Sequence, residues 1–294
     1  KFLRMKKIFF TLLCLFSLNA HADLKVVTDF APIHSLTAMV MEGVGRPYLI
    51  FQSDKNFSHH KLEITSSEMK RLKKADVVFW IGEEMTPNLK KAIAKAAPRA
   101  QSVELLNSSG LELLPVGENP LQNKEQKNDV HIWMNPENAK ILLRRISGIL
   151  GQRDPENAGK YRANARKWEK EIDTLKKYSV SENENKPLLV TLHDGYPYLF
   201  KYLNLKNTHA MNVHAEYITG PVTWKKIRQE ITDMHPKCVI SDPSLKKTEA
   251  KNMKKIKKAH VIELDVMGGK FKPTPRLYFN LMEHTISAIN KCLE

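Results

Sequence analysis

The sequence predicts an α/β protein with two lobes, each built on a parallel, Rossmann-like sheet, and one long rigid helix that joins them. Three observations support this. Short apolar runs alternate with stretches of helical spacing. The alternation stops at a polar break over 179–186 and then restarts. Between the halves lies one long amphipathic segment. We therefore expect an N-terminal lobe over 23–153, a linking helix over 154–180 and a C-terminal lobe over 181–294.

The first segment has the features of a secretory signal. Two lysines precede a short apolar run, and an A-H-A motif ends at Ala22. The run is shorter than the roughly 20 residues that a membrane-spanning helix needs. We expect residues 1–22 to form a signal peptide, with the start codon at Met5, and the mature chain to reach the periplasm.

The charge balance does not point to nucleic acid. The chain carries +15, and the expected leader holds four basic residues and no acidic one, which leaves +11. Many of the lysines lie in stretches with helical spacing, such as 69–74 and 246–258. We interpret these lysines as solvent-exposed residues on helix faces, so we expect no nucleic-acid partner.

In the first half, the elements alternate in a regular order. Strands are expected over 24–28, 48–51, 76–81 and 103–105. Helices are expected over 32–42, 66–74, 87–96 and 136–151. Thr65 and Glu68 form a capping-box pattern, and Pro136 is a typical first helical residue. Residues 115–129 are polar and aperiodic and predict a loop, and 131–133 read as a short strand.

The linking segment and the second half follow. Over 155–178, apolar residues recur at spacings of three and four, and 24 residues of helix span about 36 Å. Strands are then expected over 188–192, 208–213, 238–241 and 260–264. Helices are expected over 195–203, 221–234, 246–258 and 278–291. The two halves share this rhythm without an obvious sequence repeat.

Two cysteines remain after the expected leader, Cys238 and Cys292. Export permits a disulfide, and an even count favours one. Such a bond would tie the start of a strand to the last helix. Two buried thiols are the alternative.

Histidine and aspartate side chains follow the predicted strands. His60, His193 and Asp265 each come after a strand, and His131 begins a strand-to-helix unit. Ligands of open α/β sheets bind at the carboxyl ends of the strands, and a cleft between the lobes can unite these four. Three imidazoles and one carboxylate suit a tetrahedral Zn²⁺. Their long separations match no compact metal motif.

Several sequence blocks, in this order, resemble the zinc- and manganese-specific solute-binding proteins of ABC transporters, most closely the ZnuA-like zinc branch. The blocks are SHHKLEITSSEMKRLKKADVVFWIG, VHIWMNPENA, TLHDGYPYLFKYLNL, KCVISDP, ELDVMGG and KCLE. The resemblance covers nearly the whole mature chain. It implies a monomeric periplasmic binding protein, not an enzyme, that captures Zn²⁺ with high affinity and delivers it to a membrane permease.

The resemblance also implies roles for single residues. It places the metal ligands at His60, His131, His193 and Asp265. It also pairs the two cysteines, Cys238 and Cys292, in a disulfide.

Three further residues have less definite roles. His59 stands where zinc-binding members often carry glutamate, and it is an extra ligand, a proton-dependent neighbour or a solvent-exposed residue. Asp242 is expected to orient a ligand histidine. His209 is a candidate for a second, weaker metal site.

Two departures from the family pattern bear on the metal. The loop before the second histidine contains no histidine, so an accessory metal-gathering loop is not expected. Manganese-binding members usually carry glutamate in place of the third histidine. Because imidazole suits zinc and oxygen ligands suit manganese, His193 favours zinc.

Other functions stay open. A manganese-binding protein or a metal-binding adhesin would share the fold. A zinc hydrolase would use three histidines and an open position, but no HExxH or GxSxG motif is present and Asp194 is the one candidate base. Asp265 as a fourth ligand would fill the water's place.

Overall fold

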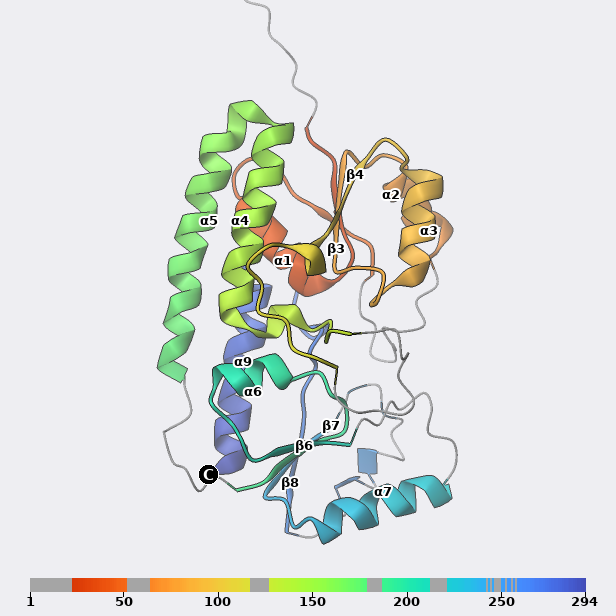
Figure 1. Cartoon of the computed structure of the whole chain (residues 1–294), viewed down its shortest axis with the longest axis vertical. Coiled ribbons are helices and arrows are strands. Elements are labelled where there is room, and N and C mark those ends of the chain that lie inside the picture. The colour runs from red at the N-terminus through yellow and green to blue at the C-terminus, as the bar shows by residue number, and fades with distance from the viewer. Residues whose placement is uncertain are drawn as a thin grey trace, which may run out of the picture.

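The computed structural model describes residues 23–51, 64–116, 127–178, 187–211, 221–241 and 258–294, with residues 243, 245, 250, 251, 253, 254 and 256. The expected signal peptide and His59, His60 and Asp242 lie outside these residues. Two lobes, each with its own parallel sheet, lie one above the other in Figure 1. The α/β fold with two parallel sheets is confirmed.

The N-terminal lobe holds a sheet in the order β2-β1-β3-β4, with every pair parallel. Its strands are β1 (Val26–Thr28), β2 (Tyr48–Leu49), β3 (Val77–Trp80) and β4 (Gln101–Glu104). Its helices are α1 (Ala31–Val40), α2 (Ser66–Leu72) and α3 (Pro87–Ala96). The predicted capping box at Thr65 and Glu68 is present and fixes the start of α2.

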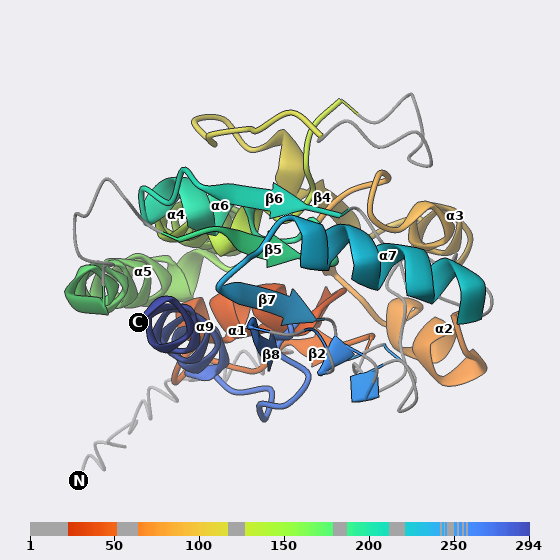
Figure 2. The same cartoon turned by 90° about the horizontal axis from the view of Figure 1, so that it is seen from below.

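The C-terminal lobe repeats this topology, with the strand order β6-β5-β7-β8. Its strands are β5 (Leu189–Thr191), β6 (Thr208–Ala210), β7 (Cys238–Ser241) and β8 (His260–Glu263). Its helices include α6 (Pro197–Tyr202), α7 (Pro221–Asp233) and α9 (Leu277–Leu293). Figure 2 shows α7 and α9 on either side of this sheet. Much of the helix predicted over 246–258 lies outside the described residues.

The long helix predicted over 155–178 is confirmed. It consists of α5 (Ala158–Asp173) extended at both ends by 3-10 turns, Pro155–Asn157 and Thr174–Tyr178. It packs along α4 (Pro136–Arg153), as Figure 1 shows.

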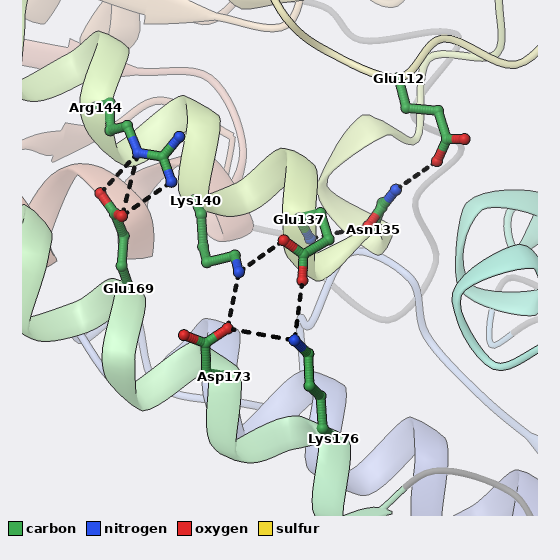
Figure 3. A network of polar contacts seen from close by, with 8 residues as sticks. All are labelled: Glu112, Asn135, Glu137, Lys140, Arg144, Glu169, Asp173 and Lys176. Atoms are coloured by element: carbon green, nitrogen blue, oxygen red, sulfur yellow. Dashed lines mark hydrogen bonds and ion pairs between the residues drawn. The ribbon is translucent and has the colours of Figure 1, made fainter.

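Ion pairs join α4 to α5 on their outer faces (Figure 3). Lys140 pairs with Asp173 at 2.7 Å, and Arg144 pairs with Glu169 at 3.0 Å. Exposed pairs of this kind contribute roughly 0–1 kcal/mol each, so the apolar stripe on α5 supplies most of the packing energy.

The last helix gives the lobes a second connection. At its start, the backbone N–H of Tyr278 donates to Ser35 Oγ at 2.9 Å, and the Tyr278 hydroxyl donates to the Trp133 carbonyl at 2.9 Å. At its end, Cys292 forms the predicted disulfide with Cys238, with the Cα atoms 5.6 Å apart. One apolar core therefore continues from β1 to the end of α9.

The prediction of a strand over 131–133 is wrong. Ile132–Met134 form a 3-10 turn that leads into α4, and all three side chains are buried. The reason lies in the flanking residues: the Asp129 carboxylate accepts the backbone N–H of His131, and Asn135 caps a helix that begins at Pro136. Apolar side chains alone do not distinguish a buried strand from a buried turn.

Within the part of the chain that the structure describes, no helix combines the length and the apolar composition that crossing a membrane requires.

Candidate metal site

Two predicted ligands, His131 and His193, meet between the lobes. Their Nε2 atoms are 3.2 Å apart, and their rings lie nearly perpendicular, at 86°. Both side chains are buried, with exposed fractions of 4% and 7%. Two nitrogens bound to one tetrahedral Zn²⁺ at about 2.0–2.1 Å would lie about 3.3–3.4 Å apart. The two nitrogens are within hydrogen-bond distance of each other, and their separation is also close to that of two ligands of one ion.

His131 is oriented by a buried carboxylate, Asp129. The ring Nδ1 lies 3.1 Å from Asp129 Oδ1, and the backbone N–H of His131 donates to the same oxygen at 2.8 Å. Because a carboxylate only accepts, Nδ1 carries a proton, so in the neutral form of the ring the lone pair is on Nε2, which faces His193. This is the tautomer that a metal bound at Nε2 requires.

Sequence reasoning missed Asp129 and assigned the orienting role to Asp242, which lies outside the described residues. The available signal was an aspartate two residues before a candidate ligand histidine. Ligating histidines usually donate their second ring N–H to a carboxylate or a carbonyl.

His193 lies in a bend just beyond the end of β5, as predicted. Space there is tight: a Cβ on Gly195 would lie 2.8 Å from the His193 ring and 2.9 Å from Val266. The glycine thus lets the β5 bend approach the turn after β8, because any larger residue would meet both Val266 and the His193 ring.

Asp265 lies in that turn after β8. Its carboxylate accepts from the backbone N–H groups of Met267 at 2.8 Å and Gly269 at 2.6 Å. The next residue, Val266, accepts from Trp133 Nε1 at 2.9 Å, and the Trp133 ring packs edge-on against His131. The Asp265 turn is therefore adjacent to the segment that carries His131.

The described residues bring two of the predicted ligands together, His131 and His193, but they do not bring Asp265 into a metal-binding group with them. No group of three histidine, cysteine, aspartate or glutamate side chains with metal-binding geometry occurs among them. The predicted ligand His60, with its neighbour His59, is outside that set. That His60 completes the site, with His59 as a candidate extra ligand, stays a prediction.

Asp194 belongs to the electrostatic surroundings of the pair. Burial raises its pKa, and the negative charge of Asp129 raises it further, while His131 opposes this shift. Two carboxyl groups and two imidazoles therefore share this region.

The structure places His209 elsewhere. It lies on the edge strand β6, in register with Val190, and its side chain is exposed. It borders a surface hollow of about 590 Å³ with residues of α7, among them Glu230 and Asp233. A second site at His209 stays a prediction.

The fold and the site geometry define a class: two-lobed α/β proteins with a pair of histidines between the lobes.

Comparison with known proteins identifies the family. The zinc-uptake complex component A periplasmic family, ZnuA, matches residues 26–292, and the chain belongs to it. The high-affinity zinc uptake system protein ZnuA of Brucella abortus (strain 2308) is 28% identical over 307 residues, which cover 91% of each chain. The family consists of periplasmic metal-binding components of uptake systems, so the chain is not an enzyme.

Solved structures agree on the fold. A crystal structure of ZnuA matches with a TM-score of 0.76 at 14% identity, over 93% of this chain and 100% of that one. FpvC from Pseudomonas aeruginosa, in complex with Mn²⁺, matches with a TM-score of 0.78 at 18% identity, over 92% and 99%. At these identities the likeness shows the fold alone.

Proposed function

We propose that the chain captures Zn²⁺ in the periplasm with high affinity and delivers it to the permease of an ABC transporter. The ligands are His60, His131, His193 and Asp265. The supporting observation is the 3.2 Å separation of the two Nε2 atoms from opposite lobes. Family membership and the zinc-uptake relatives support the cargo and the partner.

Zinc is favoured over manganese by the donor atoms. Imidazole nitrogen suits zinc, whereas manganese prefers oxygen ligands. Neutral imidazoles also bring no charge repulsion among themselves, and one carboxylate offsets part of the 2+ charge. Manganese preference, as in a manganese-binding protein or an adhesin of this fold, is the alternative outcome.

The test is a competitive titration of the metal-free mature chain, 23–294, with a chromophoric chelator and elemental analysis. One tightly bound Zn²⁺ per chain is expected, with loss of tight binding in His60→Ala, His131→Ala and His193→Ala. His284→Gln, an exposed histidine on α9, is the control and should bind as the parent does.

Two results would contradict the proposal. One is tight zinc binding that survives all three ligand substitutions. The other is a parent protein that binds Mn²⁺ more tightly than Zn²⁺, and His193→Glu then tests whether this position sets the preference.

A further inference from the structure

We propose that Tyr198 is a positioning residue for the metal site: it fixes His131 opposite His193 by holding Asp129 from the other lobe. The proposal rests on the proposed function for the identity of the metal. Its geometry involves the described residues alone.

The Tyr198 hydroxyl joins two backbone segments of the N-terminal half. Tyr198 belongs to α6, five residues after His193, and is fully buried. Its hydroxyl donates to the Asp129 carbonyl at 2.9 Å and accepts the Leu114 N–H at 3.1 Å. The backbone N–H of Asp129 donates to the Leu114 carbonyl at 2.8 Å, so the hydroxyl closes the base of the intervening loop.

Asp129 transmits this constraint to His131. Its carbonyl is held by Tyr198, while its carboxylate holds both the backbone N–H and the ring Nδ1 of His131. The contacts form a closed circuit. His193 and Tyr198 belong to the same chain segment, and Tyr198 holds Asp129 by a hydrogen bond. Asp129 in turn holds His131, whose ring faces His193. A closed circuit of this kind fixes the separation of the two Nε2 atoms before any metal binds, which lowers the cost of ordering the site.

The hydroxyl, and not only the ring, is needed. A partly buried N–H and a buried carbonyl both depend on it, and losing it would leave the two groups without their partner. Burial raises the pKa of Tyr198 to about 12, so the hydroxyl keeps its proton and remains a donor at periplasmic pH.

The helix offers a matched control. Tyr202 lies one turn further along α6, and its hydroxyl oxygen is buried without a hydrogen-bond partner among the described residues. Tyr198→Phe and Tyr202→Phe therefore remove the same group from the same helix. Both keep the ring that fills the core, and circular dichroism checks that both fold.

The first measurement is the zinc Kd of the mature chain by chelator competition. Tyr198→Phe should raise the Kd about tenfold, as for losses around a ligand histidine, while Tyr202→Phe stays within about twofold. Asp129→Asn should also weaken binding. Because Tyr198 acts through Asp129, the double variant should bind no more weakly than Asp129→Asn alone. An unchanged Kd in Tyr198→Phe, or fully additive effects, would overturn the proposal.

The second measurement needs no metal. Side-chain ¹⁵N NMR of the metal-free protein should show His131 protonated at Nδ1 in the parent and in Tyr202→Phe, and a mixture of tautomers in Tyr198→Phe. An unaltered His131 spectrum in Tyr198→Phe contradicts the circuit. A parent protein that fails to bind zinc would refute the proposed function, and the NMR result would still decide the role of Tyr198.

Discussion

Asp29 is a buried carboxylic acid at the carboxyl end of β1. It is fully inaccessible, and its two oxygens accept the backbone N–H groups of Phe30 and Ile81, each at 2.7 Å. It therefore links the start of α1 to the end of β3. In a sheet of this strand order, β1 and β3 flank the point where the strand order reverses, and the Asp29 carboxyl group lies at the carboxyl ends of these two strands.

The pKa of Asp29 predicts a pH dependence of folding. Burial raises this pKa from 3.8 to about 7, against the lowering effect of the backbone hydrogen bonds. The folded protein thus prefers the neutral acid, so the stabilisation is present below about pH 4 and is lost as the pH rises to about 7. Relative to Asp29→Asn, the free energy of unfolding of the parent should fall by about 2–3 kcal/mol between pH 5 and pH 8.

Urea unfolding of both metal-free proteins at the two pH values measures this difference. Contributions from other titrating groups cancel in the comparison because the two chains differ at one residue. A difference that stays constant, or grows with pH, would show that Asp29 is ionised in the folded state at pH 5.

At the scale of single residues, the sequence predicts where the two histidines lie, but it does not predict the side chains that hold His131 in place. His193 comes from the rule that polar residues after strands lie at the carboxyl ends of a sheet, and His131 comes from its place at the start of the segment that leads into a helix. Asp129 precedes its histidine by two residues, a contact that depends on a local turn. Tyr198 acts through a hydroxyl that reaches the other lobe, and no spacing in the sequence shows which backbone groups lie there.

At the scale of elements, local signals set most of the boundaries. The helix predicted over 87–96 and the strand over 238–241 agree with α3 and β7 residue for residue. Both begin or end at strong local signals, such as Pro87 and the apolar run CVIS. The 131–133 segment fails because its conformation depends on the Asp129 side chain and the Asn135 cap, which act on backbone groups and leave no hydrophobic period.

The capping box of α2 gives a prediction at this scale. Thr65→Ala should lower the free energy of unfolding by about 1 kcal/mol, because the Glu68 N–H loses its side-chain acceptor. Ser66→Ala, an exposed change at the first helical residue, is the control and should shift stability by less than about 0.5 kcal/mol. Equal losses in the two variants would show that the box contributes nothing. Urea unfolding of the metal-free protein measures both.

At the scale of the whole molecule, two sheets of identical strand order are bound into one body. The apolar core includes residues of β1 and β3 and continues to β7 and α9. The sequence predicts the alternation of strands and helices in both halves and the long helix between them. It does not predict the packing of α9 on α1, since contacts more than 200 residues apart, such as Ser35 with Tyr278, leave no local pattern.

The disulfide should stabilise the fold without controlling the site. It closes a loop with a sequence separation of 54 between the start of β7 and the end of α9. Loop entropy assigns such a bond about 4 kcal/mol. The Cys238→Ala/Cys292→Ala variant should lose stability on that order, by urea unfolding, yet keep the zinc Kd within about threefold, because the bond lies at the amino end of β7 and the site at the carboxyl ends. A large loss of affinity in a folded variant would contradict this separation.

Zinc binding should leave the arrangement of the lobes nearly unchanged. The lobes are joined by α5, by α9 and by a shared core, and the Tyr278 hydroxyl donates across to Trp133 beside His131. A wide hinge motion would break all of these contacts at once, and packed cores deform little before they break. Small-angle scattering of the metal-free and zinc-loaded mature chain should therefore give the same radius of gyration within about 0.5 Å. The radius expected for a chain of this length is roughly 18 Å. A larger decrease on loading would mean that the lobes close as rigid bodies, and the site geometry seen here would then belong to the closed form alone.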